Sequence, residues 1–496
     1  MLSARLRWTT STPGGLSVRN ASHSTVAAAG SSAFNALISK SEDASRPAQG
    51  ATGYLAGRTV AVKDNIVTKD VPTTAASHVL TGYGSPFDAT VIRLLRQHGA
   101  AVTAKTNMDE FGMGSHSQQS YSHPVLSPFS RHGIALSPGG SSGGSAVAVA
   151  TGECWAALGT DTGGSVRLPA AYTGVVGFKP SYGLLSRWGV IQYANSLDTV
   201  GVLTRTVKDA GDIFRCLNAH DHRDPTSLPL SLRARLESRQ QEPHLRIGIP
   251  LEYNIDEMSP AVRSAYIRTL TALQSAGHSL HPVSLPSTRH ALSAYYVLAP
   301  AEASSNLAKY DGIRYGHRAT GPDASPQSAL PLYARTRGEG FGDEVQRRIL
   351  LGAYTLSSEA MDNYFIQAQK VRRVVQRDFD RVFARANPLL DREVAAGDEG
   401  GIDLLLTPTA PTLPPTVTEV KKQSPVEGYM NDVFTVPASL AGLPAISVPV
   451  PLSRSEREGM EDTDVTSVGL QVIGQFGDDE LVLRAAAEVV DHSQDS

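Results

Sequence analysis

The chain has little cysteine and almost no net charge. Only two of its 496 residues are cysteines, which excludes a disulfide framework or a cysteine-rich zinc site and suits a reducing compartment. The formal charge is −3, from 45 basic and 48 acidic residues. This balance argues against electrostatic binding of nucleic acid along the whole chain. No stretch approaches the roughly 20 apolar residues of a membrane-spanning helix, so no membrane span is expected.

The first 41 residues contain no aspartate or glutamate. They carry Arg5, Arg7, Arg19 and Lys40 among many serine, threonine and alanine residues. This basic, acid-free and hydroxyl-rich composition is typical of a mitochondrial transit peptide, although a disordered tail is the alternative. We therefore predict a transit peptide over about residues 1–30, with its cleavage site open, and a location in the mitochondrial matrix.

The rest of the chain has the pattern of a large α/β protein. Hydrophobic residues make up 41% of the sequence, which is enough for a substantial core. Residues 58–62 and 101–105 are predicted strands with a helix between them, and residues 260–277 have the apolar spacing of an amphipathic helix. Residues 343–385 are predicted to form two consecutive helices. We see no break that forces a second domain, and we predict one domain over residues 31–496.

Two glycine–serine loops lie 24 residues apart. They are Gly-Gly-Ser-Ser-Gly-Gly-Ser at 139–145 and Asp-Thr-Gly-Gly-Ser-Val-Arg at 161–167, and Lys63 precedes them in Val-Ala-Val-Lys-Asp-Asn. Glycine lets backbone N–H groups approach a developing negative charge, serine can act as a nucleophile, and an unprotonated lysine can act as its base. The combination indicates acyl transfer without a histidine.

Two other interpretations of the first loop are weaker. Ser141 and Ser142 each satisfy the G-x-S-x-G pattern of α/β-hydrolases, but the preceding Ser-Pro-Gly-Gly is a poor end for the strand that this motif needs. The loop also lacks the Gly-Lys-Ser/Thr ending of a phosphate-binding P-loop and the spacing of a dinucleotide site.

The run from Gly139 to Pro180 closely resembles the signature of the amidase signature family. The resemblance implies an α/β fold with a large central mixed β-sheet covered by helices on both faces. It also implies amide hydrolysis by a Ser–cis-Ser–Lys triad, with Ser165 as nucleophile, Ser141 as bridging serine with a cis peptide, and Lys63 as base. The residues implied around this triad are Thr162, Gly163 and Gly164 for the oxyanion hole, formed with Ser165, and Ser142, Asp161 and Arg167 as supporting contacts.

Elementary chemistry agrees with the role of Lys63. A lysine with its ordinary pKa near 10.4 must be desolvated to act as a base near neutral pH. The apolar run Val60-Ala61-Val62 could provide that burial. Taken alone, Lys63 could equally be a solvated lysine at a strand end, and Asp161 and Arg167 could be an ordinary surface ion pair.

Segments in the C-terminal half indicate which amide is the substrate. They resemble the A subunits of glutamyl-tRNA(Gln) amidotransferases within the same family, at residues 301–307, 310–316, 340–352, 429–432 and 441–444. A pocket for free glutamine needs a fixed cation for the α-carboxylate and a fixed anion for the α-ammonium. The resemblance implies Arg348 as this cation and Asp432 as this anion, with Tyr295 as a weaker contact. Arg347 is the alternative to Arg348.

The resemblance implies a glutaminase component that releases ammonia for the conversion of Glu-tRNA(Gln) into Gln-tRNA(Gln). No cofactor or metal is expected in this chain. ATP and Mg²⁺ are expected on a tRNA-binding kinase/transamidase partner of the B type, and a small third partner of the C or F type completes a heterotrimer. A free-standing amidase acting on small amides is the main alternative, and a scaffold without catalysis is a further one.

Overall fold

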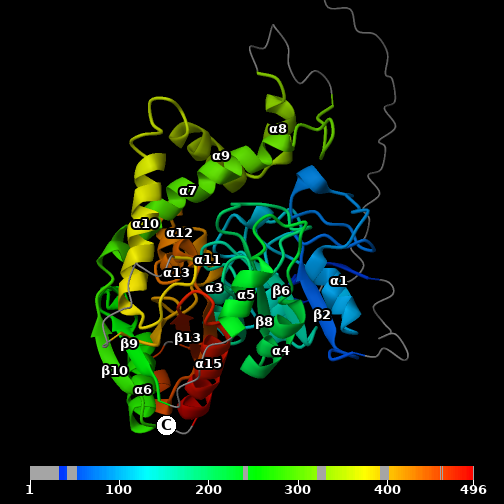
Figure 1. Cartoon of the computed structure of the whole chain (residues 1–496). Coiled ribbons are helices and arrows are strands. Elements are labelled where there is room, and N and C mark those ends of the chain that lie inside the picture. The colour runs from blue at the N-terminus through cyan, green and yellow to red at the C-terminus, as the bar shows by residue number, and fades with distance from the viewer. Residues whose placement is uncertain are drawn as a thin grey trace, which may run out of the picture.

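The centre of the molecule is a mixed β-sheet, as the computed structural model in Figure 1 shows. The structure describes residues 33–41, 53–237, 244–320, 331–390, 401–458, 460 and 462–494. Within these ranges, eleven strands form the sheet. The predicted transit peptide lies outside the described residues and stays a prediction, as does the single domain over residues 31–496.

Neighbouring strands of the sheet run in both directions. In the described residues, four of the neighbouring strand pairs are parallel and the other six are antiparallel, which confirms a mixed sheet. Across the sheet the order is β1 (Leu37–Lys40), β3 (Ala101–Thr106), β2 (Thr59–Lys63), β6 (Ala156–Asp161), β8 (Thr199–Thr204), β7 (Val176–Lys179), β12 (Ala445–Pro451), β13 (Ser467–Gly474), β11 (Leu404–Pro408), β9 (Arg246–Pro250) and β10 (Ser279–Val283).

Helices cover both faces of this sheet. Val60 and Val62 of β2 belong to a core shared with one set of helices, whereas Ala61, between them, packs with the other set. This alternation follows from the two-residue repeat of a strand. The first set is α1 (Thr90–Gln97), α4 (Val207–Leu217), α6 (Pro260–Ser275) and α15 (Asp479–Gln494), and the second is α2 (Gly143–Ala150) and α3 (Arg167–Thr173).

A further group of helices lies beyond the sheet, in the upper and middle parts of Figure 1. Leu298, Val345 and Phe379 share a core there that also includes Leu405 of β11. The group consists of α7 (Ala291–Asn306), α8 (Ala334–Gly340), α9 (Asp343–Thr355), α10 (Phe365–Val382) and α13 (Val436–Ala441). The two helices predicted over residues 343–385 are therefore confirmed as α9 and α10, and the one over 260–277 as α6. None of the helices in the described part of the chain has the length and apolarity to cross a membrane.

The sheet topology brings Lys63 and the second glycine–serine loop to one edge. Strands β2 and β6 are parallel neighbours, so their carboxyl ends meet there. Lys63 is the last residue of β2 and Asp161 the last of β6. Helix α2 begins at Gly143, directly after the first serine pair, and packs on both strands.

Candidate active site

Lys63 is a buried cation surrounded by uncharged oxygen atoms. Its Nζ donates to Ser141 Oγ at 2.7 Å, to Ser142 Oγ at 2.8 Å and to the carbonyl oxygen of Thr160 at 3.2 Å. The side chain is 0% exposed, so it is not a solvated lysine at a strand end. Burial lowers the pKa of Lys63 to about 7, although more distant carboxylates oppose that shift. A lysine in this state can exchange a proton near neutral pH.

The first serine loop is tightly packed around a cis peptide bond between Gly140 and Ser141. The N–H of Asp109 donates to the Ser141 carbonyl oxygen at 3.3 Å. A Cβ atom on Gly140 would collide with Asp109 Oδ2 and with the backbone N of His116. Only glycine fits at position 140, and it allows Ser141 to sit beside Lys63.

The second serine loop is joined to the first through Ser142. The N–H of Ser142 donates to the Ser165 carbonyl oxygen at 3.1 Å, and Ser142 Oγ donates to the Thr160 carbonyl oxygen at 3.3 Å. No described group accepts a hydrogen bond from the N–H groups of Gly163, Gly164 or Ser165. These donors are therefore available to an anion, and Gly164 has a φ of +144° that favours glycine.

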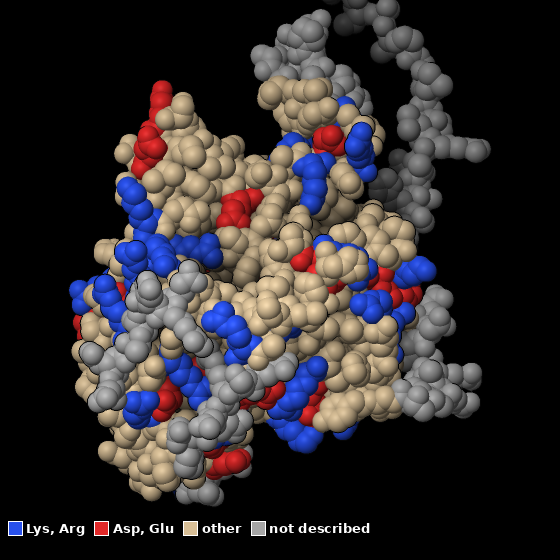
Figure 2. All heavy atoms as spheres, in the orientation of Figure 1, with Lys and Arg blue, Asp and Glu red and all other residues tan. Residues whose placement is uncertain are grey.

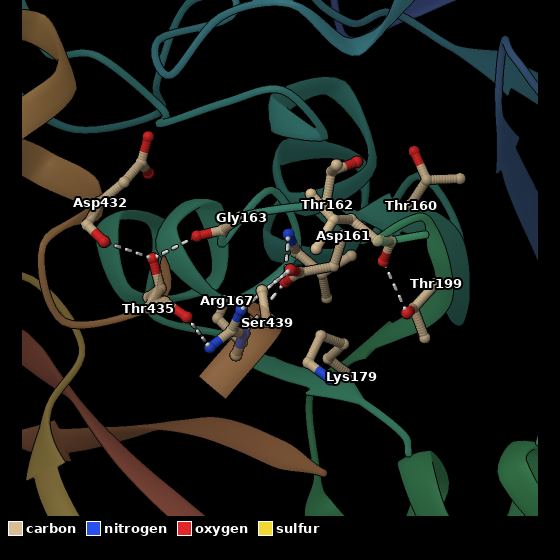
Figure 3. A network of polar contacts seen from close by, with 12 residues as sticks. Thr160, Asp161, Thr162, Gly163, Arg167, Lys179, Thr199, Asp432, Thr435 and Ser439 are labelled. Atoms are coloured by element: carbon tan, nitrogen blue, oxygen red, sulfur yellow. Dashed lines mark hydrogen bonds and ion pairs between the residues drawn. The ribbon is translucent and has the colours of Figure 1, made fainter. Parts of the chain in front are cut away.

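Asp161 and Arg167 form a buried pair rather than a surface one. Both side chains are 0% exposed, and the Arg167 guanidinium donates twice to the carboxylate, from Nε at 3.0 Å and from Nη2 at 2.9 Å. Burial raises the pKa of the Asp161 carboxyl, but the charge and hydrogen bonds of Arg167, the Lys179 charge and the Val166 N–H together hold the pKa below its ordinary value. Figure 3 shows this pair beside Ser439, which accepts from Arg167 Nη2 at 2.7 Å.

Arg348 of α9 lies in an aromatic pocket. The guanidinium lies 5.4 to 5.8 Å from the ring centres of Tyr193, Tyr296 and Tyr429. It donates to Glu344 Oε1 at 2.8 Å and to the Tyr193 hydroxyl at 2.7 Å. Burial alone would lower the pKa of Arg348, but its interactions with Tyr193, Tyr296, Glu344 and Tyr429 together raise the pKa above the ordinary value. The pocket therefore keeps a permanent positive charge.

Its neighbour Arg347 has a different environment. The Arg347 side chain is 50% exposed, against 4% for Arg348, and it pairs with the other oxygen of Glu344. Adjacent residues of a helix point in different directions, which explains the contrast. Both arginines line one cavity of about 470 Å³, which also reaches Asp109, Ser115 and Tyr429.

Asp432 and Tyr295 lie against the second serine loop. A Cβ atom on Gly164 would lie 3.4 Å from Asp432 Oδ1, and one on Gly163 would lie 2.6 Å from Tyr295 Cζ. Ser115 Oγ donates to Asp432 Oδ2 at 2.7 Å. Tyr296 donates to the same oxygen at 3.2 Å. Tyr296 also contacts Arg348, so it connects Arg348 with Asp432 and the second serine loop. Burial raises the pKa of Asp432 to about 7.

The sequence pattern that defines the amidase family matches residues 16–483. The chain belongs to the amidase family. It is 57% identical over 459 residues to the mitochondrial A subunit of glutamyl-tRNA(Gln) amidotransferase from Ajellomyces capsulatus, covering 86% of this chain and 88% of that protein. The protein of the same name from Emericella nidulans is 58% identical over 449 residues, covering 87% and 88%.

A crystal structure of the glutamyl-tRNA(Gln) amidotransferase A subunit from Thermotoga maritima is similar to this amidase. The TM-score is 0.68 at 35% identity, over 91% of this chain and 86% of that one. The amidase fold expected from the signature run is therefore confirmed. The names of the Ajellomyces and Emericella relatives also confirm the expected mitochondrial location.

Several residues of this amidase site escaped the sequence interpretation. Asp109, Ser115, Tyr193 and Tyr296 contact the predicted residues but belong to neither loop motif, and Tyr429 lies in the segment 429–432 without a predicted role. Position is a signal for two of them, since Tyr296 follows Tyr295 and Tyr429 lies three residues before Asp432. Across the described ranges, no group of three His, Cys, Asp or Glu side chains could hold a metal ion.

Proposed function

We propose that this chain is the glutamine-hydrolysing component of a mitochondrial glutamyl-tRNA(Gln) amidotransferase. The contact between the buried Lys63 amine and Ser141 Oγ, at 2.7 Å, carries the catalytic part of this proposal. A lysine whose pKa lies at about 7 is partly unprotonated at neutral pH and can serve as a general base. The names of the relatives support the choice of reaction.

In the proposed mechanism Ser165 attacks the side-chain amide carbon of glutamine. Its proton passes to Ser141 while the Ser141 proton passes to Lys63. The C=O electron pair moves to the amide oxygen and gives a tetrahedral oxyanion. The proton then returns through Ser141 to the amide nitrogen, the C–N bond breaks, and ammonia leaves a γ-glutamyl ester on Ser165. Water, activated by the same relay, hydrolyses this ester to glutamate.

The N–H groups of Thr162, Gly163, Gly164 and Ser165 supply the oxyanion hole in this proposal. Those of Gly163, Gly164 and Ser165 have no acceptor among the described residues, so they can face the developing charge. Donors already in place stabilise the transition state without reorganisation, and removing one typically costs about 10²–10³ in rate. Ser142, Asp161 and Arg167 support the loop that carries these donors.

Substrate recognition is assigned to the pocket between α9 and the second loop. Arg348 would bind the α-carboxylate of glutamine and Asp432 the α-ammonium, with Tyr295 as a further contact. We assign the carboxylate to Arg348 rather than Arg347 because only Arg348 is buried among the tyrosine rings. A buried cation and a buried carboxylate would select an amino acid amide over a simple amide.

The partner proteins complete the proposal. A tRNA-binding kinase/transamidase partner of the B type would hold ATP and Mg²⁺, activate the glutamyl group on the tRNA and receive the ammonia. A small third partner of the C or F type would complete a heterotrimer. Basic and acidic side chains are interspersed on the face shown in Figure 2, and the net charge is −3. This distribution is consistent with a partner that makes most contacts to the tRNA.

The decisive test is Ser165→Ala in the assembled complex. We expect glutamine-driven transamidation to be lost, because the nucleophile is gone, while ammonia-driven transamidation persists. Loss of both reactions in a correctly assembled complex would contradict the proposal. Robust hydrolysis of simple amides by the isolated chain would instead favour a free-standing amidase.

A further inference from the structure

Thr435 holds an unusual position at the start of α13. It is the residue before the first helical turn, where a threonine side chain normally accepts a hydrogen bond from its own helix. Its side chain makes no such bond. Thr435 Oγ1 lies 2.7 Å from the Gly163 carbonyl oxygen and 3.1 Å from that of Asp432, and Thr435 is fully buried. The hydroxyl is thus used for the second serine loop, not for helix capping.

The hydrogen bond to Gly163 acts on a peptide unit of the proposed oxyanion hole. The Gly163 carbonyl and the Gly164 N–H belong to one planar peptide group. In a trans peptide these two groups point in opposite directions, so fixing the carbonyl fixes the direction of the N–H. No acceptor for the Gly164 N–H exists among the described residues, which leaves Thr435 as the constraint on this plane.

Thr435 is itself held firmly. Arg167 Nη1 donates to the Thr435 carbonyl oxygen at 2.9 Å, and the same guanidinium pairs with Asp161 at the end of β6. A Cβ atom on Gly164 would collide with Thr435 Oγ1, so the loop and the threonine are in close contact. Figure 3 shows Thr435 between Gly163 and Asp432, with Arg167 beside it.

We propose that Thr435 is a positioning residue that aims the Gly164 N–H at the oxygen that becomes negative during amide cleavage. This inference rests on the proposed function, since the oxyanion hole is part of it. Thr435 acts through the peptide plane and need not touch the substrate. Its loss should therefore slow the chemical step without weakening glutamine binding.

The test compares Thr435→Val with Thr435→Ser in the assembled complex. Valine keeps the shape and removes the hydroxyl, whereas serine keeps the hydroxyl. We expect the valine variant to lose about 10- to 100-fold in kcat for glutamine hydrolysis, less than the loss of a whole oxyanion donor, with KM within about twofold. The serine variant should stay within about threefold of the parent in kcat.

Thr288→Val is a matched control for the loss of a buried hydroxyl. Thr288 is also buried and donates to a backbone carbonyl, that of Leu285 at 2.6 Å, but it belongs to the segment η5 (Pro286–His290). We expect this control to lower the melting temperature and leave kcat unchanged. Ammonia-driven transamidation reports assembly of every variant, and Thr435→Ala replaces the valine variant if that chain does not assemble.

Three outcomes would overturn the proposal. They are an assembled valine or alanine variant with kcat near the parent value, an effect on KM rather than kcat, and a serine variant as slow as the valine variant. Ser165→Ala in the same assay separates the two proposals. If it abolishes glutamine hydrolysis while Thr435→Val does not slow it, only the role of Thr435 falls. If Ser165→Ala keeps the activity, the proposed function falls as well.

Discussion

The pKa values of two buried basic side chains, Lys63 and Arg348, are shifted in opposite directions. Lys63 and Arg348 are both almost completely buried, yet burial lowers the pKa of Lys63 to about 7, while the pKa of Arg348 is raised above its ordinary value. The difference lies in their immediate neighbours. Lys63 contacts two serine hydroxyls and a backbone carbonyl, whereas Arg348 contacts the Glu344 carboxylate and three tyrosine rings.

This contrast shows how one protein interior can supply both a base and a fixed charge. A cation surrounded only by neutral dipoles loses its proton readily, because desolvation is not compensated. An arginine is always protonated near neutral pH, and tyrosines and a carboxylate around Arg348 raise its pKa further, so its charge stays available to bind an anion. We therefore expect substitutions at the two cations to fail in different ways: at Lys63 in kcat, and at Arg348 in KM.

The largest effect should come from Lys63→Met. Without a base near neutral pH, kcat for glutamine hydrolysis should fall by about 10²–10⁴-fold, while ammonia-driven transamidation persists. Lys179→Met is the matched control, because Lys179 is also a buried lysine with its pKa lowered to about 7, but it donates to the backbone carbonyls of Pro180 and Leu443. The control should mainly lower the melting temperature, and its effect on kcat should be much smaller than that of Lys63→Met. Equal losses of kcat in both variants would contradict the role of Lys63.

Substitution also distinguishes the roles of the two serines beside Lys63, Ser141 and Ser142. Ser141→Ala should cost about 10²–10³ in kcat because the proton relay is broken. Ser142→Ala should cost about tenfold, because the Ser142 hydroxyl also accepts from Lys63 but directs its own proton to the Thr160 carbonyl oxygen rather than into the relay. Steady-state kinetics of both variants decide the assignment, and the reverse ranking would transfer the relay to Ser142.

Substitution of Arg348 should affect binding. Arg348→Lys replaces a planar fork by a point charge, and loss of charge-assisted hydrogen bonds worth about 1.5–3 kcal/mol should raise KM for glutamine about 10- to 100-fold. The effect on kcat should be small. Arg347→Lys, at a half-exposed side chain, should leave KM within about twofold. An effect on KM from Arg347 alone would reverse the assignment.

The last prediction changes no residue and concerns the pH dependence of glutamine hydrolysis. Lys63 must be unprotonated to accept a proton and Asp432 must be ionised to bind an ammonium, and both have pKa values of about 7. Acidification below their pKa values protonates both groups, so kcat/KM for glutamine should fall about tenfold or more per pH unit. The kcat profile should report Lys63, and the KM profile Asp432. A flat profile across neutral pH would contradict both assignments.

The residue types of the catalytic loops were predictable because they lie in two short motifs that resemble the family signature. The alternation of β2 puts Lys63 on the face of Ala61, toward α2 and α3, and the glycines around Ser141 and Ser165 allow backbone shapes that few other residues tolerate. The mixed sheet and the helices α6, α9 and α10 followed from apolar periodicity and from the family resemblance. None of these inferences needed contacts between distant segments.

The rest of the site depends on such contacts. Nothing in the sequence pattern connects Thr435 with Gly163, 272 residues away, or Ser115 with Asp432. The choice between Arg347 and Arg348 also required the structure, because neighbouring arginines look alike in the sequence until one of them is buried among tyrosines.

The sequence by itself determined the chemistry that we propose for this amidase, since Lys63, Ser141 and Ser165 lie in motifs whose residue types allow acyl transfer. Only the tertiary structure decided which pKa values are shifted, which N–H groups of the described loops lack an acceptor and which of the two arginines is buried. The physical reason is that a residue's type sets what it can do, whereas burial and the charges around it set its protonation and its direction. Those surroundings are built from segments hundreds of residues apart.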